Sequence, residues 1–248
     1  MKRTSRELGR ISRDILNNRY RIPMGAFVAA GLITAVIRLP FSSPENDFQT
    51  VPQLVITLLA EFLIMLISQV LRAGVVQVHL NMTRAKEFHL LQIFNPFRAG
   101  TDRYFGASFL LCILFILCCL PFTSGSVYFY LTDTTAFSIC VLALSGLLSL
   151  ALILLLLLNY TFVLFFLLDY PQMKVMSAFG ECRKMMKGNQ GRFLILLTGF
   201  AGYGALIVCS LGLASLWAAP YMTQTLVTFY LDCTCELDRI PVRDYGSP

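Results

Sequence analysis

Two opposite charges within apolar stretches are the residues most capable of chemistry in this sequence. Glu61 lies near the middle of the apolar run 52–74, and Arg38 lies toward the end of the preceding run, 23–41. A carboxylate inside a bilayer is costly unless it is paired, protonated or hydrated. Glu61 and Arg38 therefore form a candidate intramembrane pair across a helical hairpin. The alternative is that Glu61 is the proton or cation site of a transporter.

Other reactive residue types do not form a recognisable site. His79 and His89 are the only histidines, and they lack the spacing of a membrane metalloprotease. The glycine-rich stretch 199–204 lies within an apolar run, which favours close helix packing over nucleotide binding. Cys233 and Cys235 lack further metal ligands nearby. The sequence thus predicts no catalytic, cofactor-binding or metal-binding residues, and no enzymatic activity.

Composition indicates a membrane protein. Of 248 residues, 56% are hydrophobic and 14% are charged, whereas roughly a quarter of the residues in a soluble domain are charged. Several apolar runs reach the roughly 20 residues that a helix needs to cross a bilayer. The net charge of +6 does not indicate nucleic acid, because no RNA-binding motif accompanies it.

We therefore predict an all-α, polytopic bundle of six membrane-spanning helices with a basic segment before it (1–22) and a tail after it (232–248). The predicted crossings are 23–41, 52–74, 104–122, 139–168, 193–209 and 214–231. The fourth run is longer than one perpendicular span and must tilt or project. The last two runs are short and meet at 210–212, which suits a tight hairpin.

Lysine and arginine predict the orientation of these crossings. They gather in the N-terminal segment, in 84–103, in 174–192 and after 231, whereas the three opposite loops, 42–51, 123–135 and 210–213, have none. Because positive residues are retained on the cytoplasmic side, we expect a protein of the cytoplasmic membrane with both termini in the cytoplasm.

Two of the basic segments have the pattern of helices that lie in a membrane interface. In the first, the apolar residues on one face are Leu8, Ile11 and Ile15, and the cations on the other are Arg6, Arg10 and Arg13. In the second, Val175, Phe179, Cys182 and Met186 share a face opposite Lys174, Ser177, Glu181 and Lys184. We expect the apolar side chains to enter the anionic inner leaflet and the cations to contact headgroups.

A family resemblance adds to this interpretation. Its ordered motifs are Leu168-Asp169-Tyr170-Pro171, Ser177-Ala178, Arg183-Lys184-Met185-Met186-Lys187-Gly188-Asn189, Trp217, Pro220-Tyr221 and Phe229-Tyr230. In these motifs the chain resembles a bacterial family of multi-pass membrane proteins known as domain-of-unknown-function family 975. The resemblance implies a helical bundle in the cytoplasmic membrane and no assigned reaction.

The central motif also has a direct physical reading. Asp169 ends a crossing, and Tyr170-Pro171 breaks the helix because a residue before proline avoids the α region. Pro171 then suits the first turn of the next helix. That helix runs to Lys187, and Gly188-Asn189 can adopt the left-handed conformation that ends it.

The sequence favours a non-catalytic membrane protein that binds lipids of the inner leaflet, or an unidentified membrane-protein partner, through its basic segments. The alternative is a small-molecule or ion transporter or channel that uses Glu61, Arg38 and Asn159 along a polar path.

Overall fold

The computed structural model describes residues 3–17, 19–41, 51–98, 100–132 and 135–240. Every regular element within these residues is a helix, as the all-α prediction requires. In chain order the elements are α1 (Ser5–Leu16), α2 (Arg21–Arg38), η1 (Leu39–Phe41), α3 (Val51–Thr83), η2 (Leu90–Phe94), α4 (Asn95–Arg98), α5 (Thr101–Leu131), α6 (Ala136–Tyr160), α7 (Val163–Asp169), α8 (Val175–Met186), α9 (Gln190–Cys209) and α10 (Ser215–Cys233).

The described chain has five helical stretches that are long and apolar enough to cross a membrane, not the six that we predicted. They are Arg21–Phe41, Val55–Thr83, Thr101–Leu131, Ala136–Asp169 and Gln190–Cys209. α10 occupies the place of the sixth predicted crossing, 214–231, but it is not one of these five. Polar residues such as Gln224, Thr225 and Thr228 lower the mean hydropathy of α10, and all three are buried within the protein.

Several helices extend beyond the predicted crossings. α3 continues to Thr83 instead of stopping at 74, and α5 continues to Leu131 through most of the predicted loop 123–135. The predicted loop 42–51 falls almost wholly outside the described residues. Hydropathy marks where side chains become polar, whereas a helix continues for as long as its backbone hydrogen bonds are satisfied.

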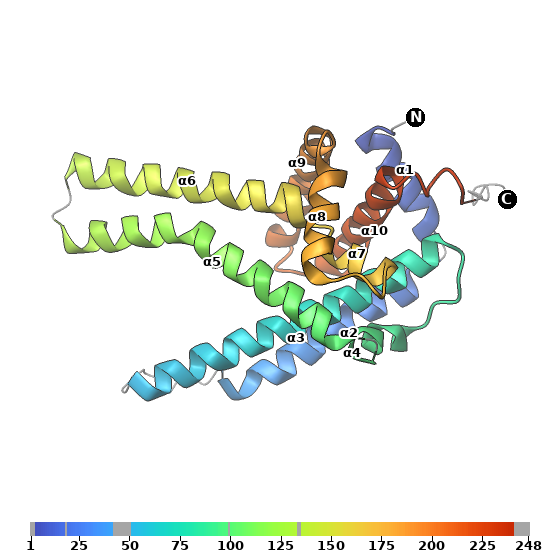
Figure 1. Ribbon diagram of the computed structural model, residues 1–248, viewed down its shortest axis with the longest axis horizontal. Helices are drawn as coiled ribbons and strands as arrows, with labels where there is room; N and C mark the ends of the chain where they lie inside the picture. Colours follow the sequence, from blue (N-terminus) through green and yellow to red (C-terminus); the bar gives the residue numbers. More distant parts are fainter. Residues whose placement is uncertain (1–2, 18, 42–50, 99, 133–134, 241–248) are drawn as a thin grey trace.

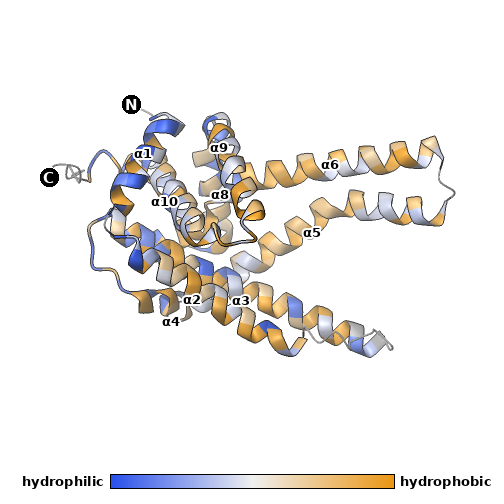
Figure 2. Cartoon of the chain, turned by 180° about the vertical axis from the view of Figure 1, so that it is seen from behind, coloured by the Kyte–Doolittle hydropathy of each residue, from blue (hydrophilic) through white to orange (hydrophobic). Residues whose placement is uncertain are grey.

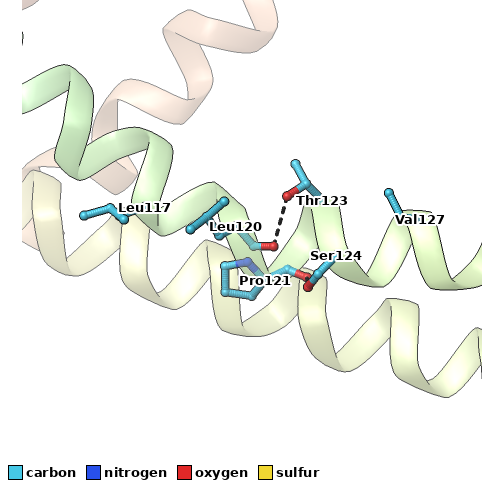
Figure 3. Close-up of a pocket in the computed structure, with 6 residues that line it drawn as sticks. All are labelled: Leu117, Leu120, Pro121, Thr123, Ser124 and Val127. Carbon is cyan, nitrogen blue, oxygen red and sulfur yellow. Dashed lines mark hydrogen bonds between the residues drawn. The ribbon is translucent and has the colours of Figure 1, made fainter.

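Pro121 lies inside α5 without ending it. A proline ring displaces the preceding turn and disrupts the local hydrogen-bond ladder, and the backbone N–H of Phe122 donates instead to Ser149 Oγ of α6, at 2.9 Å. Figure 3 shows the surface hollow beside this proline, where the Thr123 hydroxyl donates to the Leu120 carbonyl of its own helix. The polar groups beside Pro121 therefore find their hydrogen-bond partners within α5 and α6.

Two long hairpins, α2–α3 and α5–α6, extend in diverging directions from one compact end of the molecule (Figure 1). That end holds α1, α7, α8 and α10, together with both ends of the described chain. Hydrophobic colour dominates the α5–α6 hairpin, whereas hydrophilic colour is concentrated on α1 (Figure 2). We call the compact end the basic end, because the arginine- and lysine-rich segments meet there.

Aromatic side chains form the centre of the basic end. Phe162 stacks on Phe229 with ring centroids 5.6 Å apart, and Phe193 lies 5.3 Å from both rings. Phe162 occupies the break between α6 and α7, where its backbone leaves the helical region. The fourth predicted crossing, 139–168, is therefore two helices, and the break inserts a buried aromatic ring into the core.

α1 covers the protein core, which corrects the expectation that its apolar face enters lipid. Leu8 is 1% exposed and belongs to the same core cluster as the aromatic rings. Ile15 and Leu16 pack with Met82 of α3 in a second cluster. The Thr4 side chain caps the start of α1, and Glu7 completes the capping box. These contacts place the hydrophobic face of α1 against other helices.

α8 is corrected in the same way. Phe179, Cys182 and Met186 are buried in the core. The Cys182 thiol donates to the carbonyl oxygen of Asn159 at 3.1 Å, just before the break that follows α6. Burial raises the pKa of the Cys182 thiol to about 12, so the thiol stays protonated and acts as a small donor. α8 therefore packs across the α6–α7 junction.

Gly74 provides a test of this packing. A Cβ atom at this position of α3 would lie 2.1 Å from the backbone oxygen of Ile93 in η2. Backbone cannot yield as a flexible side chain does, so we expect Gly74→Ala to lower Tm in mild detergent by several degrees. Gly31→Ala is the control, because a Cβ atom there meets nothing within 4 Å. Equal Tm values for the two variants would contradict the described contact of α3 with η2.

Candidate functional site

The Asp169 carboxylate, at the end of α7, is held at the basic end by residues from two other segments. Arg84, just after α3, donates to its two oxygens at 2.7 and 2.9 Å. The Tyr230 hydroxyl of α10 donates to the same carboxylate at 2.8 Å. Such bidentate guanidinium pairs are among the stronger ionic contacts in proteins. Asp169 therefore joins α3, α7 and α10.

Arg84 binds a second carboxylate as well. Its Nε and Nη2 atoms each donate to Glu236 at 2.7 Å. Burial lowers the pKa of Arg84, but its hydrogen bonds with Asp169 and Glu236 outweigh burial and raise the pKa overall. The guanidinium thus stays charged and links α7 to the segment after α10. The start of the predicted tail, 232–248, is packed on the bundle as far as the structure describes it.

Asp232, near the end of α10, is a second buried carboxylate, and its side chain is only 2% exposed. Arg192 of α9 donates to it at 2.6 Å and Arg3 donates at 3.3 Å. Arg3 also pairs with Asp238 at 2.7 Å, and the Arg192 guanidinium lies 5.5 Å from the ring centroid of Phe229. This cluster fixes the N-terminal segment, α9 and α10 to one another.

A chain of uncharged hydrogen bonds lies between α3 and α10. His79 Nδ1 is 2.8 Å from Gln224 Oε1, and the Gln224 amide donates to the Thr83 hydroxyl at 2.7 Å. Thr228, one turn later on α10, is 2.9 Å from the Ser12 hydroxyl of α1. Buried polar groups need such partners, so the polar residues of α10 select its neighbours. Within the described ranges, no three potential metal ligands lie together.

The candidate pair Arg38 and Glu61 lies on the α2–α3 hairpin. Arg38 Nε and Nη2 donate to the two Glu61 oxygens at 3.0 and 2.7 Å. Their side chains are 57% and 37% exposed on the protein surface. The contact has the geometry of the hairpin pair that we hypothesised, and it joins neighbouring helices without contributing to an enclosed site.

The other residues of the family-like motif have separate positions. Pro171 lies in an exposed turn and α8 begins only at Val175, which corrects the expectation that Pro171 opens that helix. Gly188 has the left-handed conformation, with φ of 87°. Asn189 is buried, and its side chain donates to the Met185 carbonyl at 2.7 Å. Gly188 and Asn189 therefore join α8 to α9.

Pro220 and Tyr221 lie on α10. Pro220 is buried inside the helix. The Tyr221 ring lies 5.1 Å from the Tyr203 ring of α9. A Cβ atom on Gly9 of α1 would lie 2.8 Å from the Tyr221 hydroxyl, so glycine permits the close approach of α1 to α10.

The cations that we predicted to contact the inner leaflet are all exposed at the basic end. They are Arg6, Arg10, Arg13, Lys174 and Lys184. Of these, Lys184 pairs with Glu181 at 2.8 Å within α8.

Three cations line a surface pocket of about 710 Å³ where α6, α8 and α9 meet. We call it the α8 pocket, and its lining residues are Asn159, Tyr160, Gly180, Arg183, Lys184, Lys187 and Gln190. Gln190 donates to Asn159 Oδ1 at 2.9 Å, which ties the start of α9 to the end of α6. The arrangement combines positive charge with amide groups and is suited to an anion.

Comparison with known families supports the resemblance seen in the sequence. A family model described as Protein of unknown function (DUF975) matches residues 1–236. The chain belongs to this family. No curated protein and no solved structure matches the chain. Membership in DUF975 confirms the family that the motifs indicated.

Sequence reasoning did not identify the ion clusters of this DUF975 protein. In the sequence, Arg84 and Arg192 indicate only which side of the membrane their segments face. Asp232 and Glu236 lie in the predicted tail, 232–248. The position of Asp232 at the end of an apolar run was the available signal, because such a carboxylate needs a cation nearby. Which arginine supplies it depends on how distant helices meet.

The two carboxylates on Arg84 should differ in importance. The Asp169 side chain is 12% exposed and that of Glu236 is 34% exposed. We expect Asp169→Asn to destabilise the protein by about 2 kcal/mol, because it weakens a largely buried ionic contact. The matched change Glu236→Gln should cost less than about 1 kcal/mol. Thermal unfolding in mild detergent measures both, and a larger effect of Glu236→Gln would contradict this ranking.

The pair on the α2–α3 hairpin should show coupling. Glu61→Leu removes the carboxylate beside Arg38 within an apolar span, so it should lower Tm. The double variant Arg38→Leu with Glu61→Leu removes both charges and should recover most of that loss. Thermal unfolding of the single and double variants provides the test. If the loss of Tm in the double variant equals the sum of the losses in the two single variants, the two side chains act independently.

Proposed function

We propose that this chain is a non-catalytic protein of the cytoplasmic membrane that binds anionic phospholipid at its basic end. In this proposal the basic end and both termini face the cytoplasm, as the distribution of lysine and arginine favours. The α8 pocket is the binding site, and the phosphate of a lipid headgroup is the group that it binds.

The observation that carries the proposal is the position of the pocket beside exposed apolar helix surface. Leu155 lies one turn before Asn159 on α6, and Leu194 lies one turn after Gln190 on α9; both are exposed. The headgroup region of the pocket therefore continues into surfaces where acyl chains can pack. A soluble anion would need the cations alone, whereas a phospholipid uses both parts.

Charge favours an anionic headgroup. Arg183, Lys184 and Lys187 contribute three positive charges to the lining, and the Glu181 carboxylate pairs with Lys184. The pocket keeps a net positive charge after this pair is counted. Each cation near an anionic membrane surface contributes about 1 kcal/mol of attraction, so three cations can distinguish an anionic headgroup from a zwitterionic one.

The buried acids support a structural role over a catalytic one. Asp169 is bound by Arg84 and Tyr230, and Asp232 is bound by Arg192 and Arg3. A general acid or base must exchange a proton with a substrate, whereas the oxygens of these carboxylates accept hydrogen bonds from guanidinium groups of the protein itself. We therefore assign both of them to the assembly of the basic end.

Neutralising the pocket tests the function. The variant Arg183→Gln, Lys184→Gln, Lys187→Gln should retain at least tenfold less phosphatidylglycerol than the wild type when purified in mild detergent and analysed by native mass spectrometry. The control is Lys86→Gln, Arg98→Gln, Arg239→Gln, which removes the same charge from exposed positions outside the pocket. It should retain lipid as the wild type does.

Three results would contradict the proposal. Equal lipid loss in both variants would mean that only the overall charge matters and that the α8 pocket is not a site. Solute or proton flux into liposomes that requires the wild-type protein and is lost in Glu61→Gln would favour the transporter instead. A protein that copurifies with the wild type and is lost only from the pocket variant would identify a protein partner in place of lipid.

A further inference from the structure

We propose a second anionic phospholipid site, in the groove between α1, α9 and α10. The groove has a volume of about 630 Å³, and we call it the α9 slot. The residues that carry the argument are Arg6, Arg13, Gly199, Phe200, Tyr203 and Tyr221. The proposal rests on the proposed function only for the class of ligand, because the slot and the α8 pocket share no lining residue.

Positive charge lies along the α1 wall of the slot. Arg6 and Arg13 are both exposed and line the groove. Seven residues are about two helical turns, so both side chains project from the same face of α1. The nearby Glu7 carboxylate accepts the backbone N–H of Thr4 at 2.8 Å as part of the helix cap. The slot thus presents two guanidinium groups to a phosphate.

The slot is also lined by Tyr203 and Tyr221, whose hydroxyl groups can form uncharged hydrogen bonds. The rings of Tyr203 and Tyr221 are 5.1 Å apart and come from α9 and α10. Gly9 lets α1 approach the Tyr221 hydroxyl closely. Tyrosine is common where an apolar environment meets a polar one, because its ring is apolar and its hydroxyl can bond to polar groups. These hydroxyls suit the glycerol and ester region of a phospholipid.

The large apolar side chains that line the slot lie on α9, whereas Thr198 and Thr225 add two further hydroxyls to the lining. Phe200 lines the groove, and Ile195 is 63% exposed. A Cβ atom on Gly199 would meet nothing within 4 Å, so glycine leaves open space beside these side chains. The groove thus combines cations, hydroxyls and apolar surface, which are the groups that the phosphate, glycerol and acyl chains of a phospholipid contact. The α9 slot is therefore a lipid site that recognises headgroup charge.

Filling the open space tests this assignment without removing a charge. Gly199→Leu places a side chain in the slot and improves helix propensity, so the protein should still fold. Gly204→Leu is the matched control, because its Cβ also meets nothing within 4 Å and its position does not line the slot. Both variants should keep the wild-type Tm to within a few degrees.

The readout is the number of lipids bound to the full chain, counted by native mass spectrometry after titration with phosphatidylglycerol or with phosphatidylcholine of the same acyl chains. We expect two tightly bound phosphatidylglycerol molecules for the wild type and for Gly204→Leu, and one for Gly199→Leu. Arg6→Gln with Arg13→Gln should also retain one, whereas Lys86→Gln with Arg98→Gln, at exposed positions outside both sites, should retain two. Phosphatidylcholine should bind at least tenfold more weakly in every case.

The two lipid sites can fail separately. If Gly199→Leu keeps both lipids, the α9 slot is not a site, whereas the proposed function stands on the α8 pocket. If the Arg183, Lys184 and Lys187 variant keeps both lipids while Gly199→Leu loses one, the slot stands and the pocket fails. Equal affinity for phosphatidylcholine would overturn recognition of the headgroup by Arg6 and Arg13. A wild-type dimer that Gly199→Leu converts to monomer would show that a second copy occupies the slot.

Discussion

Two carboxylates that are largely removed from water, Asp169 and Asp232, determine how the basic end assembles. An ionised carboxylate in such a place is stable only when a cation and further hydrogen bonds compensate for its lost hydration. Neither carboxylate has its cation on its own helix: Arg84 follows α3, and Arg192 begins α9. Four distant parts of the chain must therefore meet before both charges are satisfied. The aromatic core around Phe162 contacts both ion clusters. Tyr230 stacks on Phe162 and donates to Asp169, and Arg192 lies over the ring of Phe229.

The arginines and lysines of the basic end consequently fall into two sets with different uses. Arg3, Arg84 and Arg192 are bound to carboxylates and hold segments together. Arg6, Arg13, Arg183, Lys184 and Lys187 instead line surface depressions. The first set neutralises charge within the protein, and the second presents net positive charge to its surroundings even though Lys184 pairs with Glu181. This division explains how one end of a small bundle can be both stably packed and strongly basic.

α9 lies between the two proposed lipid sites and shows why lipid would matter to this fold. Arg192 and Phe193 fasten its beginning to the rest of the protein, whereas Ile195, Leu206 and Val208 remain exposed. α1 and α8 pack their apolar faces on the core and leave their polar faces outward. The surfaces beside α9 thus have protein on one side and open apolar helix on the other. Bound phospholipid would complete the packing of this helix.

Hydropathy and charge patterns determined the class of this protein because both depend on local composition. Long apolar runs require helices in a bilayer. The motifs from Asp169 to Tyr230 indicated the family, and the family model matches residues 1–236. The turn at Gly188 was also predictable, since glycine adopts a left-handed backbone without steric cost. Even the contact of Arg38 with Glu61 follows from short connectivity, because the two residues lie on consecutive antiparallel helices.

Tertiary structure alone decided which surfaces face protein and which face their surroundings. An amphipathic pattern in α1 or α8 fits a lipid interface and a protein core equally well, because both bury apolar side chains. The same limit applies to α10, because its sequence did not reveal that Thr228 bonds with α1 and Gln224 with α3. The sequence by itself determined helices, charges and family. The partners of Asp169 and Asp232 and the walls of both proposed lipid sites come from residues far apart in the chain, and only folding brings them together.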